Sequence, residues 1–190
     1  EILDEIIKHA PNGRHFGFEP IPYLNKFLND KFKDNTKISI FNTALTNKKG
    51  TVSFNIVKNA LAYSGLRQRK YAIKSPDIEQ VNVDADLLDN KLNLNVKIDL
   101  IKIDVEGAEF LVLEGAKQTI KKNKPVIIIE FGMDASEFYE SSPAKLYDFV
   151  TDELNMKIST LHNFINKKTI LSKMELEFLY ESNKEYYCHH

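Results

Sequence analysis

Apolar residues recur along the chain at two kinds of spacing, and together these predict an α/β protein. Spacings of three and four residues predict helices, whereas alternating or uninterrupted apolar residues predict strands. Helices are expected over residues 1–10, 23–32, 106–122 and 143–154, with a helical turn at 85–89. Strands are expected over residues 15–18, 37–45, 51–57, 81–83, 98–104, 126–129, 157–161 and 177–180. Because strand and helix alternate, we expect a doubly wound, mostly parallel sheet.

Three parts of this pattern bear on how the strands connect. The turn at 47–50 predicts a hairpin of the strands that flank it, 37–45 and 51–57. Residues 58–80 are polar and irregular and predict a long loop, and loops of that length in a compact domain are usually functional or mobile. The last two expected strands would close the sheet as an antiparallel pair.

Three of the expected strands end in an acidic residue: Glu19, Asp104 and Glu130. The carboxyl ends of parallel strands share one edge of the sheet, and ligands bind at that edge in open α/β folds. Asp104 belongs to a cluster of acids with Glu106 and Glu109, and Gly107 within this cluster suggests a close approach of backbone or ligand. The sequence therefore predicts a functional site at this edge.

Each of these carboxylates has both a functional and a structural interpretation. Glu19 could accept hydrogen bonds from both hydroxyls of a ribose, or it could favour the N-terminus of the following helix. Asp104 could hold a charged part of a cofactor, act as a base or bind a metal; with Glu106 it could also simply stabilise a helix N-terminus. Glu130 could take part in the chemistry or end a solvated strand. His162, which follows a later strand, could be a general base or a surface residue.

Net charge, cysteine content and the length of the apolar runs argue against several classes of function. The chain of 190 residues has a formal net charge of −1, which gives no electrostatic footprint for nucleic acid or an anionic membrane. Cys188 is the only cysteine, so no internal disulfide can form and a reducing, cytoplasmic location is expected. We expect neither a signal peptide nor a membrane span, because no apolar run is long enough to cross a bilayer. We interpret His189 and His190 as the remnant of a purification tag, which leaves residues 1–188 as one domain.

Several short motifs follow one another in a recognisable order. They are Phe18-Glu19-Pro20, Asn42-Thr43-Ala44-Leu45, residues 83–88, Ile101-Lys102-Ile103-Asp104-Val105-Glu106-Gly107-Ala108-Glu109, Leu113-Glu114-Gly115-Ala116 and Ile127-Ile128-Ile129-Glu130. In these motifs and their order, residues 1–135 resemble the FkbM-type S-adenosylmethionine-dependent methyltransferases. The resemblance implies the class I methyltransferase fold, a Rossmann-like sheet of seven strands whose last strand is antiparallel.

The resemblance also implies roles for the residues at the sheet edge. The ribose of S-adenosylmethionine is expected to bind at Glu19 and Pro20. The residues expected near its adenine are Asn42, Thr43 and Ala44. Those expected to line its methionine end and the acceptor site are Asp104, Val105 and Glu106. The acceptor is expected to face Glu130 and the loop 58–80, which contains Tyr63, Ser64 and Gly65.

One part of the family pattern is not found in the sequence. The family's first strand and glycine-rich loop precede the first helix, whereas this sequence begins within the helix 1–10. That strand would lie at the centre of the sheet, between the strands that end at Glu19 and Asp104, and its loss would leave unpaired backbone. We therefore expect the sequence to be a fragment whose preceding segment is not shown.

The resemblance implies transfer of a methyl group from S-adenosylmethionine to a hydroxyl of a sugar, a glycan or a small metabolite. The hydroxyl could be deprotonated by Asp104, Glu130 or His162, or a divalent metal held by the carboxylates could lower its pKa. Two other functions stay open. The chain could be a non-catalytic methyltransferase-like binding domain, or a nucleotide-binding oxidoreductase on a similar sheet.

Overall fold

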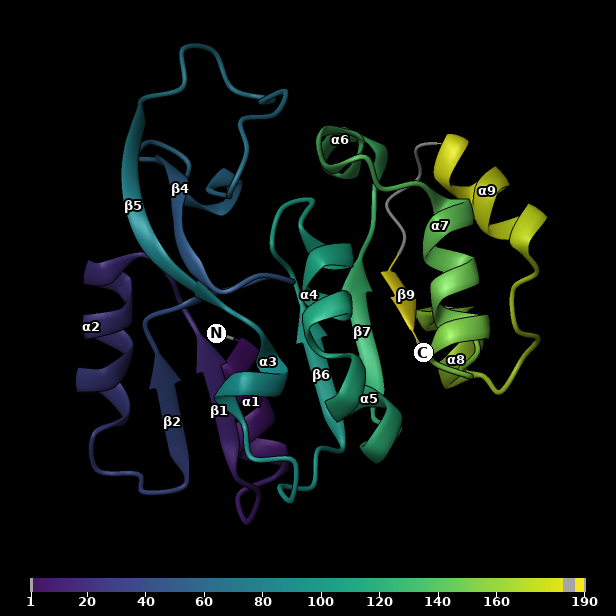
Figure 1. Ribbon diagram of the computed structural model, residues 1–190, viewed down its shortest axis with the longest axis horizontal. Coiled ribbons are helices and arrows are strands. Elements are labelled where there is room, and N and C mark those ends of the chain that lie inside the picture. The colour runs from purple at the N-terminus through teal and green to yellow at the C-terminus, as the bar shows by residue number, and fades with distance from the viewer. Residues whose placement is uncertain (1, 183–186, 190) are drawn as a thin grey trace.

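The computed structural model describes residues 2–182 and 187–189 and confirms the α/β class, with helices flanking short groups of paired strands (Figure 1). The strands are β1 (His15–Phe18), β2 (Ile38–Phe41), β3 (Ala44–Leu45), β4 (Gly50–Val57), β5 (Ile78–Asp86), β6 (Leu100–Ile103), β7 (Val126–Glu130), β8 (Ser159–Thr160) and β9 (Tyr187–His189). The α-helices are α1 (Ile2–His9), α2 (Pro22–Phe32), α3 (Leu88–Lys91), α4 (Glu109–Gly115), α5 (Lys117–Asn123), α6 (Met133–Ser136), α7 (Pro143–Asp148), α8 (Leu161–Ile165) and α9 (Lys173–Glu181). The other helical segments are the 3₁₀ turns η1 (Leu61–Tyr63) and η2 (Glu137–Tyr139) and the π-helical η3 (Phe149–Glu153).

The described strands form three hydrogen-bonded groups rather than one sheet of seven strands. β1 pairs with β2, β5 lies between β3 and β4, and the third group has the order β6-β7-β9-β8. The pairs β1–β2, β3–β5 and β6–β7 are parallel, and the other pairs are antiparallel. The sheet is therefore mixed, and the expected seven-stranded arrangement is not shown among the described residues.

The expected hairpin of 37–45 with 51–57 is wrong. β4 pairs along its whole length with β5, from Gly50 opposite Ala85 to Val57 opposite Ile78. The segment 37–45 divides into β2 and β3, which pair with β1 and β5. A local turn made the neighbouring strand the obvious partner, but β5 offers apolar side chains in matching positions, such as Val81 opposite Phe54.

The two long helices expected from the sequence are each interrupted. The helix 106–122 is divided into α4 and α5 at Ala116. A Cβ on Gly115 would overlap the carbonyl oxygen of Thr46, so the glycine lets the β3 segment pack closely against the end of α4. The helix 143–154 starts as α7 and continues as the π-helical η3, in which the amide of Leu154 donates to the carbonyl of Phe149.

The expected strand 177–180 is also wrong, because these residues lie in α9. A capping box starts that helix, with the Ser172 side chain accepting from the Glu175 amide and Glu175 accepting from the Ser172 amide. The antiparallel partner of β7 is instead β9, which also pairs with β8. β9 includes His189, whereas His190 and Glu1 lie outside the described residues.

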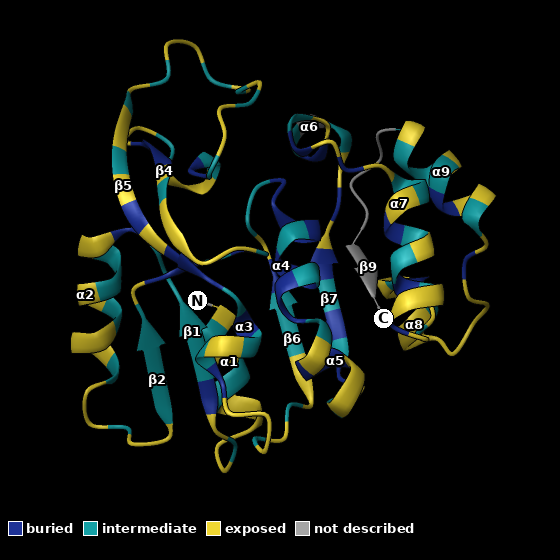
Figure 2. Cartoon of the chain, viewed as in Figure 1, coloured by how far each residue is buried: buried dark blue, intermediate teal, exposed yellow. Residues whose placement is uncertain are grey.

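The main core lies between the strands β6 and β7 and the helices that pack on them (Figure 2). Ile127 and Ile129 of β7 are fully buried, as expected for an uninterrupted apolar strand. Burial of each such side chain stabilises the fold by roughly 1.5–3 kcal/mol. A second cluster joins β4 and β5 to the start of α2 through Phe54, Val83 and Ile21. No helix among the described residues is long and apolar enough to cross a membrane.

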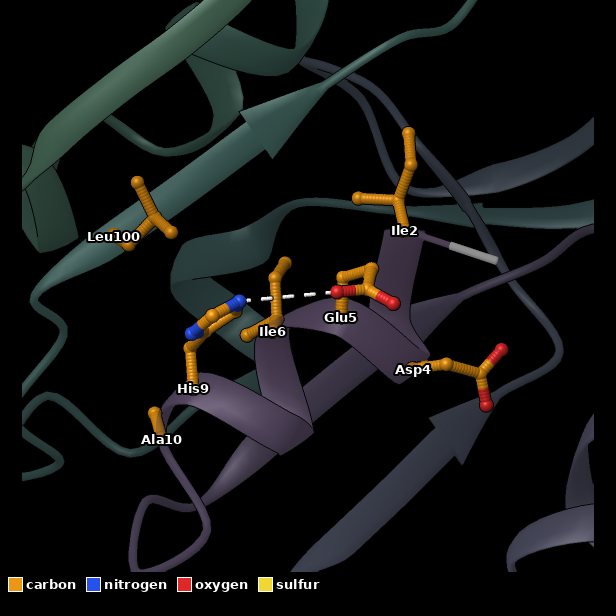
Figure 3. Close-up of a pocket in the computed structure, with 7 residues that line it drawn as sticks. All are labelled: Ile2, Asp4, Glu5, Ile6, His9, Ala10 and Leu100. Atoms are coloured by element: carbon orange, nitrogen blue, oxygen red, sulfur yellow. Dashed lines mark ion pairs between the residues drawn. The ribbon is translucent and has the colours of Figure 1, made fainter.

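A groove of about 640 Å³ lies between α1 and β6. Ile6 and His9 of α1 and Leu100 of β6 border the same space (Figure 3). Of the described strands, β1 pairs with β2 alone and β6 with β7 alone, so each keeps an unpaired edge. The first strand of the family was expected between the strands of Glu19 and Asp104, and that expectation stays a prediction.

Candidate functional site

Asp104 and Glu130 lie side by side at the carboxyl ends of two neighbouring strands. Asp104 follows β6 directly, and Glu130 is the last residue of β7. The two strands are parallel, with Ile103 opposite Ile129 in the register. The expectation that these two strand-ending acids share one edge is therefore confirmed. Both side chains are exposed, and Asp104 is held by Lys102, whose Nζ lies 2.9 Å from its Oδ2.

The turn that follows Asp104 is held from inside by Glu109. This carboxylate is buried, and its Oε1 accepts hydrogen bonds from the amides of Val105 at 3.2 Å and Gly107 at 3.1 Å. Burial raises the pKa of Glu109, although these backbone hydrogen bonds oppose the shift. Glu109 is thus a structural residue of the turn, and Val105 contributes its amide to the same arrangement.

Gly107 is required in this turn for two reasons. Its φ of +105° is a conformation that side chains rarely adopt. A Cβ there would also lie 2.6 Å from the carbonyl oxygen of Ala135 and 2.7 Å from Cε2 of Tyr139. The close approach suggested by the sequence is therefore an approach of the protein's own α6 and η2 segments.

Glu106, in the same turn, is an acid whose backbone and ionisation are both perturbed. It has a left-handed φ of 56°, and its Oε2 lies 2.8 Å from Nη2 of Arg69. Burial raises the pKa of Glu106 to about 7, against the opposing effect of Arg69, and the charges of Asp104 and Glu130 add to the rise. We call Asp104, Glu106 and Glu130 the acidic edge.

Residues 61–71, here called the strap, cross from the β4–β5 pair to the acidic edge. At one end, the Ser64 hydroxyl accepts from the Val57 amide at 3.0 Å, which fixes the strap to β4. At the other end, the Arg67 amide donates to the hydroxyl of Tyr139 at 2.9 Å, and the Arg67 guanidinium lies over the same ring at 5.3 Å. The Arg67 guanidinium also donates to the carbonyl of Phe138. The segment expected as a loop at 58–80, of which residues 78–80 belong to β5, therefore reaches the acidic edge through the ion pair of Arg69 with Glu106.

Glu19 and Asn42 meet at the carboxyl ends of β1 and β2. The Asn42 amide group donates to the carbonyls of Glu19 at 2.9 Å and Pro20 at 3.0 Å. Oε1 of Glu19 accepts from the Ile21 amide at 2.8 Å, whereas Oε2 accepts from no described residue. Burial raises the pKa of Glu19. This carboxylate therefore has one oxygen in use and one available to a ligand.

The remaining predicted residues lie less favourably for ligand contact. Thr43 and Ala44 have buried side chains, so a role near the adenine would fall to their backbone or to the exposed Asn42. His162 lies in α8, where its Nε2 is 3.2 Å from Nζ of Lys168. Because β9 lies between β8 and β7, a strand separates the His162 segment from that of Glu130. The roles assigned to these residues stay predictions.

Among the described residues, no group of three or more His, Cys, Asp or Glu side chains is arranged to hold a metal ion. Two acids of the acidic edge are engaged by cations, Asp104 by Lys102 and Glu106 by Arg69. The divalent metal considered from the sequence therefore has no ready-made ligand set in this part of the chain.

Arg69, Tyr71 and Tyr139 were not singled out from the sequence. Arg69 and Arg67 are two of only three arginines in the chain, and this concentration within one loop was a usable signal. Tyr139 lies in a segment for which the sequence predicted no element. Its contact with Gly107 depends on residues distant in the chain, so no local pattern could show it.

Comparison with known proteins agrees with this fold. The methyltransferase FkbM domain family matches residues 2–163. A similar solved structure is that of methyltransferase FkbM from Methylobacillus flagellatus KT, with a TM-score of 0.58 and 15% sequence identity. The similarity covers 99% of this chain but 40% of that one, so the chain spans less than half of its solved relative. No curated protein matches the chain. Because the family match extends over most of the sequence, the chain belongs to the FkbM methyltransferase family.

Proposed function

We propose that this protein transfers a methyl group from S-adenosylmethionine to a hydroxyl oxygen of a sugar, glycan or small metabolite. The observation that carries the proposal is the placement of Glu106: it is mostly buried, paired with Arg69, and flanked by Asp104 and Glu130 at the carboxyl edge of β6 and β7. Such a carboxylate suits the removal of a proton from a hydroxyl. The family match favours methyl transfer over hydride transfer.

The residues at the ends of β1 and β2 fit the ribose of this cofactor. Ribose hydroxyls need hydrogen-bond acceptors, and Oε2 of Glu19 is an acceptor that no described residue uses. Asn42 fixes the backbone of Glu19 and Pro20 and is itself exposed. When bound, S-adenosylmethionine supplies an electrophilic methyl group on its sulfonium sulfur. Glu19 and Asn42 are the residues that would hold its ribose.

The acidic edge would provide the proton acceptor. Glu106 would accept the proton that the hydroxyl loses when its oxygen takes the methyl group and the carbon–sulfur bond of the sulfonium breaks. Glu106 suits this role better than Asp104 or Glu130, which are both exposed. Its pKa of about 7 matches proton transfer near neutral pH. The protein's larger contribution would be alignment of the two reactants.

The test is methyl transfer from methyl-labelled S-adenosylmethionine to a panel of methyl glycosides, with product identified by mass. We expect label on a hydroxyl oxygen, with a rate that rises as pH increases through about 7, because Glu106 must be deprotonated. Glu106→Gln should lower that rate by roughly 10²–10⁴-fold and abolish this pH dependence. Glu79→Gln, an exposed carboxylate on β5, is the matched control and should leave the rate unchanged.

Two results would contradict the proposal. Label on nitrogen or carbon would exclude the assigned reaction. Binding of the cofactor without transfer to any hydroxyl would instead support the non-catalytic binding domain. An unchanged rate in Glu106→Gln would remove Glu106 from the chemistry while leaving methyl transfer itself in place.

A further inference from the structure

The strap holds two polar atoms in buried positions without a hydrogen-bond partner for either. They are Nε of Arg69 and the hydroxyl oxygen of Tyr71, and neither has a partner among the described residues. Most buried polar atoms in folded proteins are hydrogen-bonded. Two such atoms in one short segment therefore point to a hydrogen-bonding group outside the described residues.

The two atoms belong to one small cluster. The Arg69 guanidinium lies 4.8 Å from the centre of the Tyr63 ring, and the centre of the Tyr71 ring lies 6.1 Å from that of the same tyrosine. The Arg69 side chain is only 12% exposed, and its Nη2 atom is held by the 2.8 Å ion pair with Glu106. A ligand that reached both orphaned atoms would therefore lie next to the acidic edge.

The charges around the cluster favour a neutral ligand. The positive charge of Arg69 is already matched by Glu106. Asp104 and Glu130 lie close enough to Glu106 for their charges to act on it. A carboxylate or phosphate on the ligand would therefore find the charge of Arg69 already matched and further carboxylates beside it. A polyol has no such penalty, because its oxygens can accept from Arg69 and Tyr71 while its hydroxyls donate to the acidic edge.

We propose that Arg69 and Tyr71 form an acceptor subsite for a neutral sugar ring or a similar polyol, bound by hydrogen bonds from Arg69 Nε and the Tyr71 hydroxyl. This inference rests on the proposed function, because it specifies the class of acceptor that is methylated. The subsite itself makes and breaks no covalent bond. It orients the acceptor so that one of its hydroxyls faces Glu106.

The experiment is saturation-transfer NMR on the protein with a panel of methyl glycosides of neutral hexoses and 6-deoxyhexoses. Methyl glucuronide and methyl galacturonide serve as the anionic comparison. We expect at least one neutral glycoside to bind at millimolar concentration, more tightly than either uronide. Tyr71→Phe should weaken that binding by about 5- to 30-fold, the usual effect of one lost hydrogen bond to a buried group. Tyr23→Phe, the same change on the exposed face of α2, should not weaken it.

A second readout separates a ligand-binding hydroxyl from a structural one. Because the Tyr71 hydroxyl has no partner within the described chain, Tyr71→Phe should unfold at the same denaturant concentration as the wild type, or at a higher one. A lower midpoint would show a structural role and overturn the inference. So would tighter binding of the uronides, equal binding by Tyr71→Phe, or no binding by any neutral glycoside.

Titration of the same samples with S-adenosylhomocysteine distinguishes this inference from the proposed function. If the cofactor product binds and no glycoside does, the neutral-sugar subsite is wrong and methyl transfer to another acceptor stands. If glycosides bind through Tyr71 and the cofactor product does not, Arg69 and Tyr71 form a sugar-binding site but the proposed methyl transfer fails.

Discussion

Glu106 combines features that oppose its ionisation with one that favours it. Burial and the neighbouring carboxylates disfavour the charged form, and Arg69 favours it. The folded-state pKa of about 7 lies above the ordinary value of 4.5, so the folded protein retains this proton over that interval. Stability should therefore fall as pH rises from about 4.5 to 7, because the unfolded chain releases the proton first.

Glu106→Gln tests this pH dependence, because glutamine resembles the protonated acid. The variant should match the wild type in stability near pH 4 and exceed it at pH 8. The expected gain is about 1–3 kcal/mol, which discounts the full shift for the remaining solvent exposure of the side chain. Denaturant unfolding at a series of pH values measures it. Parallel stability curves for the two proteins would show that Glu106 titrates normally.

Gly107 is the residue whose replacement should most disturb the turn below the acidic edge. Gly107→Ala forces a positive φ on alanine and a clash with Ala135 and Tyr139. The expected loss of stability is roughly 2–4 kcal/mol. Gly132→Ala is the matched control, because its Cβ would meet nothing within 4 Å. Equal denaturation midpoints for the two variants would mean that η2 does not pack against the turn as described.

Among the elements, the strap depends on Tyr139 for its attachment to the acidic edge. Tyr139→Phe removes the acceptor of the Arg67 amide and should loosen the strap while the core stays folded. Trypsin cleaves after Arg67, Arg69 and Lys70, so the initial rate of cleavage within the strap should rise by roughly 5- to 10-fold, as expected from about 1 kcal/mol of lost attachment. Tyr23→Phe should leave the rate unchanged. A wild-type rate in Tyr139→Phe would show that other contacts hold the strap.

Elements with a strong local pattern were predicted correctly from the sequence. The run 126–129 is apolar and bounded by Lys124-Pro125 and Glu130, and it forms β7 as expected. Because β6 and β7 are parallel, the acids at their carboxyl ends, Asp104 and Glu130, lie at the same edge of the sheet. The alternation of helices and strands is also visible in the local sequence pattern, and it predicted the α/β class correctly.

Pairings and contacts between distant segments could not be predicted in this way. The pattern of 51–57 fits any apolar strand, so only the three-dimensional structure shows that β5 is its partner. The ion pair of Arg69 with Glu106 likewise joins segments far apart in the chain. The wrong expectation of a strand at 177–180 could have been avoided, because Ser172 followed by Glu175 is a capping-box signal for a helix.

At the scale of the whole molecule, two parallel pairs of strands point their carboxyl ends in the same direction (Figure 1). Glu19 and Asn42 lie at the end of the β1–β2 pair, and the acidic edge lies at the end of the β6–β7 pair. We infer that the β1–β2 pair holds the cofactor and that the β6–β7 pair receives the acceptor. The strap, which is joined to Glu106 through Arg69, would then cover the acceptor.

Glu19→Ala tests whether the β1–β2 pair holds the cofactor. Removal of the carboxylate should weaken binding of S-adenosylhomocysteine by roughly 1.5–3 kcal/mol for each charge-assisted hydrogen bond lost. Asp30→Ala, an exposed acid on α2, should bind with wild-type affinity. Calorimetric titration of the three proteins makes the comparison. Equal affinity in Glu19→Ala would place the cofactor elsewhere.

The most direct test of the central claim is calorimetric titration of the wild-type protein with S-adenosylhomocysteine, the product expected from methyl transfer. We expect saturable binding of one molecule per chain. Absence of saturable binding would contradict the proposed function, because a protein that cannot hold the spent cofactor cannot carry out the proposed reaction.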